Sequence, residues 1–423
     1  MLFHDSHQWS EEVFGGCDFN DSRLTRRLIM TGAHLASQPG SSVNASFKGN
    51  HALQEGAYRL FENDRVDPFA IAEGGFSTAI RFAESTEDDL LLVQDTTVLQ
   101  YSHKVRDELG DIGANLDSFK RGWLVHSSLL ISAKDETTVG LIDQDYRLRD
   151  EAERGKKHSA KQRPYEEKES HKWEDAQSRS VERLGSLMDR VVTVCDREAD
   201  VYDFLSYNIC NGYRFLVRTA YNRALSDEDS HLWDHMRSQP VLGKTKVQIR
   251  QRGGRKARVA TVTLRSAQVT IRSPYRKNRK LDPIDLWAVY IHEDNPPKGN
   301  EPLSWMLWTT ESASTLDQAL KVQRYYSLRW RIEEYHKAWK SGCNVEKVRM
   351  HYAANLQRLV VVLAFVAVRL LQLREWKQSK IACDTVLTTE EWQCLWRSTK
   401  EKRTVPKHPP SLKWAYYAIR LCH

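Results

Sequence analysis

Short apolar runs rich in β-branched residues alternate with helical stretches through the middle of this chain. The runs that predict strands are residues 90–93, 123–133, 137–148, 191–195 and 213–219. Continuous apolar runs of this length, bounded by polar residues, are typical of buried strands. Residues 166–188 have helical character and lie between two of these runs. The pattern therefore predicts an α/β core.

The first 65 residues have a helical pattern. Asn20, Asp21 and Ser22 can cap a helix that runs to about Ala36, and a second helix is expected over residues 52–61. The basic side chains on these two helices are Arg23, Arg26, Arg27 and Arg59. Two short basic helices suit contacts to a DNA backbone, although arginines on a solvated surface would give the same pattern.

Residues 240–310 alternate between apolar and polar positions, with Gly, Pro and Asn turns between the runs. The runs that predict strands are residues 246–250, 258–264, 269–272, 286–292 and 305–310. From Lys244 to Lys280 there are thirteen Lys and Arg residues and no Asp or Glu. We expect a β-rich insertion with a phosphate-facing surface. The cluster at residues 276–280 equally fits a solvated turn.

A helix is expected from Thr315 to Ser341, with Gly342 at its end, and another over residues 353–376. Four residues of the first helix have offsets of 0, 3, 7 and 14: Tyr326, Arg329, Glu333 and Lys340. At about 100° per residue they share one stripe roughly 60° wide. The opposite stripe is apolar and consists of Leu328, Ile332, Tyr335 and Trp339. The polar stripe suits a carboxylate beside phosphate-binding groups, or an ordinary solvated face.

Composition narrows the class of protein. The chain has 423 residues, 40% of them hydrophobic and 28% charged, as in a soluble globular protein of two or three domains. Its net charge of +7 is compatible with a polyanionic partner. The seven cysteines form no CxxC pair, which argues against a zinc site or a disulfide framework and favours a reducing compartment. The polar N-terminus is not a signal peptide, and the apolar run at residues 359–368 is too short to span a bilayer.

Three acidic residues are candidates for one site. Asp95 and Asp196 each follow a strand-like run, and Glu333 lies on the polar stripe of the later helix. Three clustered carboxylates repel one another and need a cation between them. Oxygen ligands favour magnesium or manganese, and two such ions can drive phosphodiester transfer. The alternative for Asp196 and Asp200 is a helix cap with first-turn acids.

These residues lie in motifs with a family resemblance. The motifs are DTT at Asp95, DREADVY at Asp196 and YSLRWRIEEYHKAWK at residues 326–340. They resemble DDE cut-and-paste transposases of the insertion-sequence-four family, and the resemblance extends from about Trp9 to Leu421. It implies an α/β fold with an RNase H-like mixed-sheet catalytic core that is interrupted by a β-rich insertion.

The resemblance also implies a division into domains. An N-terminal helical DNA-binding domain is expected at residues 1–65, and the catalytic core at residues 66–375. The insertion is expected at about residues 235–312. Residues 376–423 are expected to form a C-terminal helical region that is a shortened dimerisation domain, since the family continues beyond the position of His423.

The resemblance implies roles for particular residues. Asp95, Asp196 and Glu333 would hold two Mg²⁺ ions per active site, with Mn²⁺ as a substitute. The expected DNA contacts are Tyr326, Arg329, Lys340, Arg218, Trp305, Arg27 and Arg59. Trp305 would stack on a flipped-out base, although it also fits a core or edge-strand tryptophan. Trp308, Trp123, His126 and Cys195 are expected to be buried.

The implied function is DNA transposition. A homodimer would cleave double-stranded DNA at transposon ends through a hairpin intermediate and join the freed 3′-hydroxyl to target DNA. The expected location is the bacterial cytoplasm, on the nucleoid when DNA is bound, without a membrane. Two alternatives remain. One is an end-binding protein or inhibitor that lacks turnover because the dimerisation tail is shortened, and the other is a general nuclease on the same core.

Overall fold

The computed structural model describes residues 5–47, 49–113, 120–149, 163–226, 231–251, 256–275, 281–378, 382–385, 387–399 and 404–421. The basic cluster expected at residues 276–280 and the terminal His423 lie outside these ranges.

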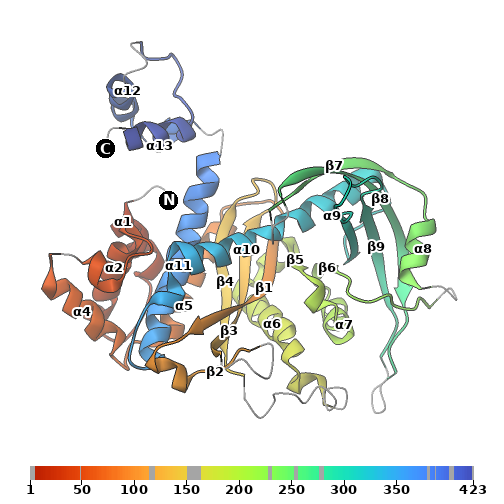
Figure 1. The fold of residues 1–423 in the computed structure, drawn as a ribbon, viewed down its shortest axis with the longest axis horizontal. Helices are drawn as coiled ribbons and strands as arrows, with labels where there is room; N and C mark the ends of the chain where they lie inside the picture. Colours follow the sequence, from red (N-terminus) through yellow and green to blue (C-terminus); the bar gives the residue numbers. More distant parts are fainter. Residues whose placement is uncertain are drawn as a thin grey trace.

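A ten-stranded mixed sheet runs through the molecule (Figure 1). Its order is β2-β3-β1-β5-β6-β10-β9-β8-β7, and β4 pairs with β3. Strands β1, β5 and β6 are parallel, and the other pairs are antiparallel. The strands are β1 (Leu90–Tyr101), β2 (Gly110–Asp111), β3 (Arg121–Ser132), β4 (Thr138–Arg147), β5 (Val191–Cys195), β6 (Arg214–Arg218), β7 (Gly243–Ile249), β8 (Arg258–Ile271), β9 (Ile284–His292) and β10 (Ser304–Thr309).

The described helices lie on both faces of this sheet, except that α12 and α13 pack on each other and α13 packs on α11, away from the sheet (Figure 1). The helices are α1 (Ser6–Phe14), α2 (Ser22–Ser37), α3 (Val43–Ser46), α4 (His51–Phe61), α5 (Pro68–Glu84), α6 (Lys172–Leu184), α7 (Tyr202–Cys210), α8 (Leu232–Ser238), α9 (Leu316–Leu328), α10 (Trp330–Lys337), α11 (Ala353–Gln378), α12 (Thr389–Ser398) and α13 (Leu412–Leu421). The N-terminal helices, α10 and α11 share one core cluster with Leu91 and Val93 of β1. Helices α6 and α7 form a second cluster with Cys195 and Val217. The central strands are buried from both sides, which explains their continuous apolar runs.

The predicted helices near the N-terminus are confirmed. Helix α2 begins after Asp21, whose side chain accepts a hydrogen bond from the backbone N–H of Arg23, and α4 begins after Asn50 in the same manner. Each predicted strand run of the core also lies in a strand of the sheet.

Two strand predictions were wrong in extent. Strand β1 does not end at Val93 but continues through Asp95, because its antiparallel pairing with β3 extends from Leu90 to Tyr101 while its parallel pairing with β5 ends at Val93. The runs at 258–264 and 269–272 are one strand, β8, because its pairing with β9 is continuous through the polar residues between them. Strands β7 to β10 extend the core sheet, since Leu307 of β10 pairs with Arg218 of β6.

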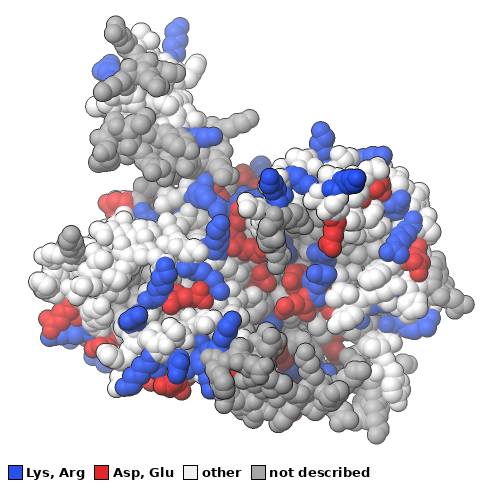
Figure 2. Space-filling model, in the orientation of Figure 1, with Lys and Arg blue, Asp and Glu red and all other residues white. Residues whose placement is uncertain are grey.

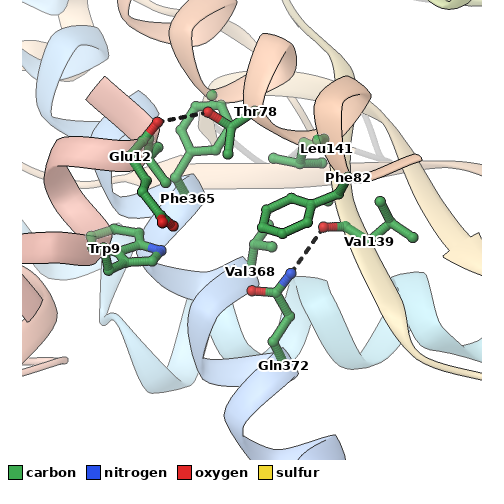
Figure 3. A pocket seen from close by; sticks show the side chains of 13 residues that line it. Trp9, Glu12, Thr78, Phe82, Val139, Leu141, Phe365, Val368 and Gln372 are labelled. Atoms are coloured by element: carbon green, nitrogen blue, oxygen red, sulfur yellow. Dashed lines mark hydrogen bonds between the residues drawn. The ribbon is translucent and has the colours of Figure 1, made fainter. Parts of the chain in front are cut away.

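Helix α11 is the central core helix. Among the described residues, Ala353–Glu375 is the one helical segment long and apolar enough to cross a membrane. This segment is longer than the apolar run at residues 359–368, which by itself is too short to span a bilayer. However, 83% of its most apolar window is buried inside the protein. A cavity of roughly 30 Å³ lies where α11 meets α1, α5 and β4 (Figure 3). It has room for about one or two water molecules, so it is a gap in packing and not a ligand site.

Candidate active site and nucleic-acid interface

Asp95 lies in β1, and Asp196 directly follows the neighbouring strand β5. Val93 of β1 pairs with Val194 of β5 in parallel register, and the two aspartates are each two residues further along. Neighbouring strands are about 4.8 Å apart, so both aspartates lie at the same end of this strand pair, and the charge of Asp196 acts on Asp95. Asp196 also caps the 3₁₀-helix η7 (Arg197–Ala199) by accepting a hydrogen bond from the N–H of Glu198 at 2.8 Å. Asp196 can therefore cap η7 and still belong to the candidate active site.

Arg329 stands at a tight turn between α9 and α10. The N–H of Arg329 bonds to the carbonyl of Tyr326, and the N–H of Ile332 bonds to the carbonyl of Arg329, so the helix narrows for one turn. The apolar stripe of the predicted helix is confirmed, since Leu328, Ile332, Tyr335 and Trp339 are all buried. The polar side faces β1.

The guanidinium of Arg329 lies between two of the three acids. Its Nη2 is 2.5 Å from Oε1 of Glu333, and its Nη1 is 3.8 Å from Oδ2 of Asp95. Nδ1 of His336 is 4.0 Å from the same Asp95 oxygen. Burial lowers the pKa of His336 to about 3, so this ring is neutral. A partly buried arginine therefore supplies positive charge beside these carboxylates.

The three acids act on one another electrostatically. Burial raises the pKa of Asp95 to about 7, and the charges of Asp196 and Glu333 act in the same direction. Arg329 and the N–H of Thr96 oppose this rise. Carboxylates that lie close together repel one another until a cation binds between them, and this repulsion adds to the effect of burial on the pKa of Asp95.

The donor chemistry of this site fits a hard divalent cation, because all three candidate ligands are carboxylates. Among the described residues, however, no group of three or more His, Cys, Asp or Glu side chains is arranged to hold a metal ion. Arg329 supplies positive charge to Asp95 and Glu333, which a bound cation would also do. The metal assignment of the three acids therefore stays a prediction.

A hollow of about 510 Å³ adjoins the acids, and we call it the Trp305 hollow. Among its lining residues are four predicted DNA contacts: Arg218, Trp305, Tyr326 and Arg329. The rings of Trp305 and Tyr326 meet edge to face at 5.0 Å, and Arg218 donates a hydrogen bond to the carbonyl of Ser304. The structure thus brings together residues from β6, β10 and α9.

Lys340 lies apart from this hollow. Its ammonium is 3.6 Å from the carboxylate of Glu346, which also accepts a hydrogen bond from the N–H of Gln100. Lys340 therefore lies toward the far end of β1 and does not line the Trp305 hollow.

Arg27 and Arg59 lie on a separate surface. Both line a hollow of about 490 Å³ between α2 and α4. Arg59 is 2.6 Å from Glu55, and Arg27 packs on Gly56, where an added Cβ would stand 2.4 Å from its Nη1. Glycine is therefore needed at position 56 for this arginine to lie across α4.

Sequence reasoning missed several residues near the acids. Arg197 lines the Trp305 hollow beside Asp196. The carboxylate of Glu334 is within 2.9 Å of three guanidinium groups, those of Arg250, Arg331 and Arg374. Arg197 and Glu334 directly follow Asp196 and Glu333 in the sequence, and this adjacency could have identified them as neighbours of the site. The partners Arg250 and Arg374 are too distant in sequence to be inferred from spacing.

The residues expected to be structural are buried. Cys195, His126, Trp123 and Trp308 all lie in the core, as predicted. Figure 2 shows Asp and Glu side chains gathered near the middle of the face seen in Figure 1, with Lys and Arg side chains on both sides. This face therefore offers acidic groups that suit cations and basic groups that suit the phosphates of DNA.

Comparison with protein-family models identifies the class of protein. A model for transposase DNA-binding matches residues 6–66, which contain α1 to α4 with Arg27 and Arg59. A model for the transposase DDE domain matches residues 141–369, more than half of the chain, including Asp196 and Glu333. Such domains generally use divalent metal ions and act on DNA. The mixed α/β sheet with its covering helices fits the RNase H-like fold of these enzymes. The chain belongs to the DDE transposases.

Proposed function

We propose that this chain is a cut-and-paste transposase of the insertion-sequence-four family, similar to the transposase of bacterial transposon five. It acts as a homodimer on transposon ends in the bacterial cytoplasm. The observation that carries the proposal is the matched register of Asp95 and Asp196, with Glu333 joined to Asp95 through Arg329. The motifs around these residues support the family.

The proposed reaction has four steps on one site. Water cleaves one strand at the transposon end, and the freed 3′-hydroxyl attacks the opposite strand to form a hairpin. Water reopens the hairpin, and the same hydroxyl joins target DNA. Two Mg²⁺ ions, held by Asp95, Asp196 and Glu333, would supply activation of the attacking oxygen and stabilisation of the departing one. Mn²⁺ can take their place.

The chain's own side chains position the DNA. Tyr326, Arg329 and Arg218 offer one hydroxyl and two guanidinium groups to the phosphates of the end. Lys340 contacts a phosphate further along. Trp305 stacks on a base extruded at the bent end, and such stacking is worth about 1–3 kcal/mol. Arg27 and Arg59 bind the DNA away from the cut.

The proposal is tested by replacing each acid. Asp95→Ala, Asp196→Ala and Glu333→Ala should each lower the rate of end cleavage in Mg²⁺ by at least about 10³-fold, or roughly 4 kcal/mol of barrier, because the ions lose a ligand. Binding of end DNA should persist. Asp135→Ala, on the turn before β4, is the matched control. Full cleavage by any of the three variants would refute the assignment.

A second candidate is an end-binding protein without turnover. The position of Arg329 between two of the acids favours it, because this arginine already supplies a counter-charge to both. Incubation with end-bearing DNA in Mg²⁺ or Mn²⁺ separates the two candidates. Binding without any nicking, over the full range of protein concentration, would favour the second.

A further inference from the structure

A second hollow adjoins the Trp305 hollow, and we call it the Trp233 hollow. It has a volume of about 270 Å³, and its lining includes Arg197, Arg218, Thr219, Trp233, Arg237 and Tyr290. Arg197 and Arg218 line both hollows. The Trp233 hollow therefore begins one residue from Asp196 and extends toward α8.

Positive charge gathers in this hollow without matching carboxylates. Arg197 is exposed and forms no ion pair with any described residue. Among the described residues, the ion-pair partner of Arg237 is the exposed Asp234, at 3.3 Å. Burial lowers the pKa of Arg218, and repulsion from Arg197 and from Arg329 acts in the same direction. A cluster of guanidinium groups that repel one another favours the binding of an anion.

The hollow also offers an aromatic surface and a free hydroxyl. Trp233 is 36% exposed, although tryptophan is normally well covered. The N–H of Trp233 bonds to the side chain of Asn222, which fixes the start of α8. The hydroxyl of Thr219 is buried and has no hydrogen-bond partner among the described residues. An unpaired buried hydroxyl beside guanidinium groups is suited to a phosphate oxygen.

We propose that the Trp233 hollow binds a nucleotide of the target DNA. Arg197 and Arg237 hold its phosphodiester, and Trp233 contacts the base or sugar beside it. The proposal rests on the proposed function, in which the Trp305 hollow holds the transposon end. The attacking 3′-hydroxyl and the target phosphate must meet at the same acids, so the target strand has to enter beside Asp196 from a surface that the end does not occupy.

The step served by this hollow is an exchange of phosphodiester bonds. A bond forms between the 3′-oxygen of the end and a target phosphorus, and the bond from that phosphorus to the target's own 3′-oxygen breaks. The proton lost by the attacking hydroxyl is balanced by the one gained by the departing hydroxyl. No other reactant is needed.

The test separates target binding from end binding. The full chain is bound to a pre-cut end, and a labelled duplex without end sequence is titrated in EDTA, with fluorescence anisotropy as the readout. Trp233→Ala and Arg237→Ala should each weaken binding of this duplex about tenfold. Affinity for the end and cleavage of uncut ends in Mg²⁺ should stay within twofold of the unaltered protein.

Two matched variants serve as controls, and thermal melting verifies that every variant folds. Lys134→Ala removes one exposed positive charge from the turn before β4, and Tyr275→Ala removes an exposed aromatic ring outside the hollow. Both should bind target duplex normally. Equal loss of end affinity and target affinity in the Trp233 or Arg237 variants, or no loss of target affinity, would overturn the proposal. Failure of the proposed function would show differently, as absence of end cleavage by the unaltered protein.

Discussion

Arg329 has two kinds of partner, proposed DNA phosphates and observed nearby carboxylates, and the sequence alone predicted only the first. Its spacing from Tyr326 and Glu333 predicted a phosphate contact on one stripe of a helix. In the structure its guanidinium also neutralises Asp95 and Glu333. Buried carboxylates close together are costly unless a cation compensates them. A DNA phosphate would therefore replace the acids as the partner of Arg329, and a divalent cation would replace Arg329 as the partner of the acids.

The raised pKa of Asp95 gives a pH-dependent prediction for the metal-free protein. The folded pKa of about 7 lies above the ordinary value of 3.8. The stability that Asp95 contributes is thus fully present below about pH 4 and is lost as the pH rises through 7. Asp95→Asn removes this titration. The free energy of unfolding of the variant relative to the unaltered protein should therefore rise between pH 4 and pH 8, by at most about 4 kcal/mol.

Urea unfolding in EDTA at several pH values measures this difference. Asp107→Asn, at an exposed acid in the 3₁₀-helix after β1, is the control and should follow the unaltered protein. Parallel stability curves for Asp95→Asn and the unaltered protein across this range would show that Asp95 is ionised normally in the fold.

Sequence reasoning at the residue scale succeeded where spacing along one element was sufficient. Tyr326, Arg329 and Glu333 were expected on one helix, and their common direction survives although the structure divides that helix into α9 and α10 at Arg329. Asp95 and Asp196 were placed by the strand runs before them. Trp233 and Arg250 were not found, because their neighbours come from other strands and helices, and only the folded sheet brings those neighbours together.

At the scale of elements, the strand pattern predicted which segments pair but not where pairing stops. The polar residues between 264 and 269 interrupt the apolar alternation, yet β8 continues because β9 offers backbone partners along its whole length. Strand β1 continues past its apolar run for the same reason. Backbone hydrogen bonds do not depend on side-chain polarity, so the composition of a run underestimates the length of a paired strand.

Asp200 joins two elements that carry residues of the site. Its buried carboxylate accepts hydrogen bonds from the N–H groups of Ala220 and Tyr221 and from Arg223. It thereby ties η7, which carries Arg197, to the segment that follows β6. Asp200→Asn should lower the free energy of unfolding by about 3 kcal/mol, because the partly buried guanidinium of Arg223 loses its buried counter-charge.

Urea unfolding of a double-mutant cycle with Arg223→Gln measures this coupling. The double variant should lose less stability than the sum of the two single variants, since the charge left alone by one change is removed by the other. Asp234→Asn, at an exposed acid of α8, should change the stability by no more than about 0.5 kcal/mol. Additive losses in the cycle would mean that Asp200 and Arg223 stabilise the fold independently.

At the scale of the whole molecule, positive charge lies on two surfaces with different neighbours. One is the hollow between α2 and α4, within residues that match a transposase DNA-binding model. The other consists of the Trp305 and Trp233 hollows beside the acids. The N-terminal helices and α11 share one core cluster with the sheet, so both surfaces belong to one packed body. DNA bound at the first surface would thus be held at a fixed orientation to the second.

This arrangement predicts that end binding and cleavage respond differently to the loss of N-terminal arginines. Arg27→Ala and Arg59→Ala should each reduce the slope of log affinity for end DNA against log salt by about 0.9, because each removes one phosphate contact. Anisotropy titrations at several salt concentrations measure the slope, with Lys134→Ala as the control. Once saturating protein is supplied at low salt, both variants should still cleave ends, since the acids and the Trp305 hollow are unchanged. A slope equal to that of the unaltered protein would place the DNA elsewhere. Loss of cleavage at saturation would mean that these arginines also position the scissile phosphate. Because their surface is separate from the acids, they could do so only by orienting the whole duplex.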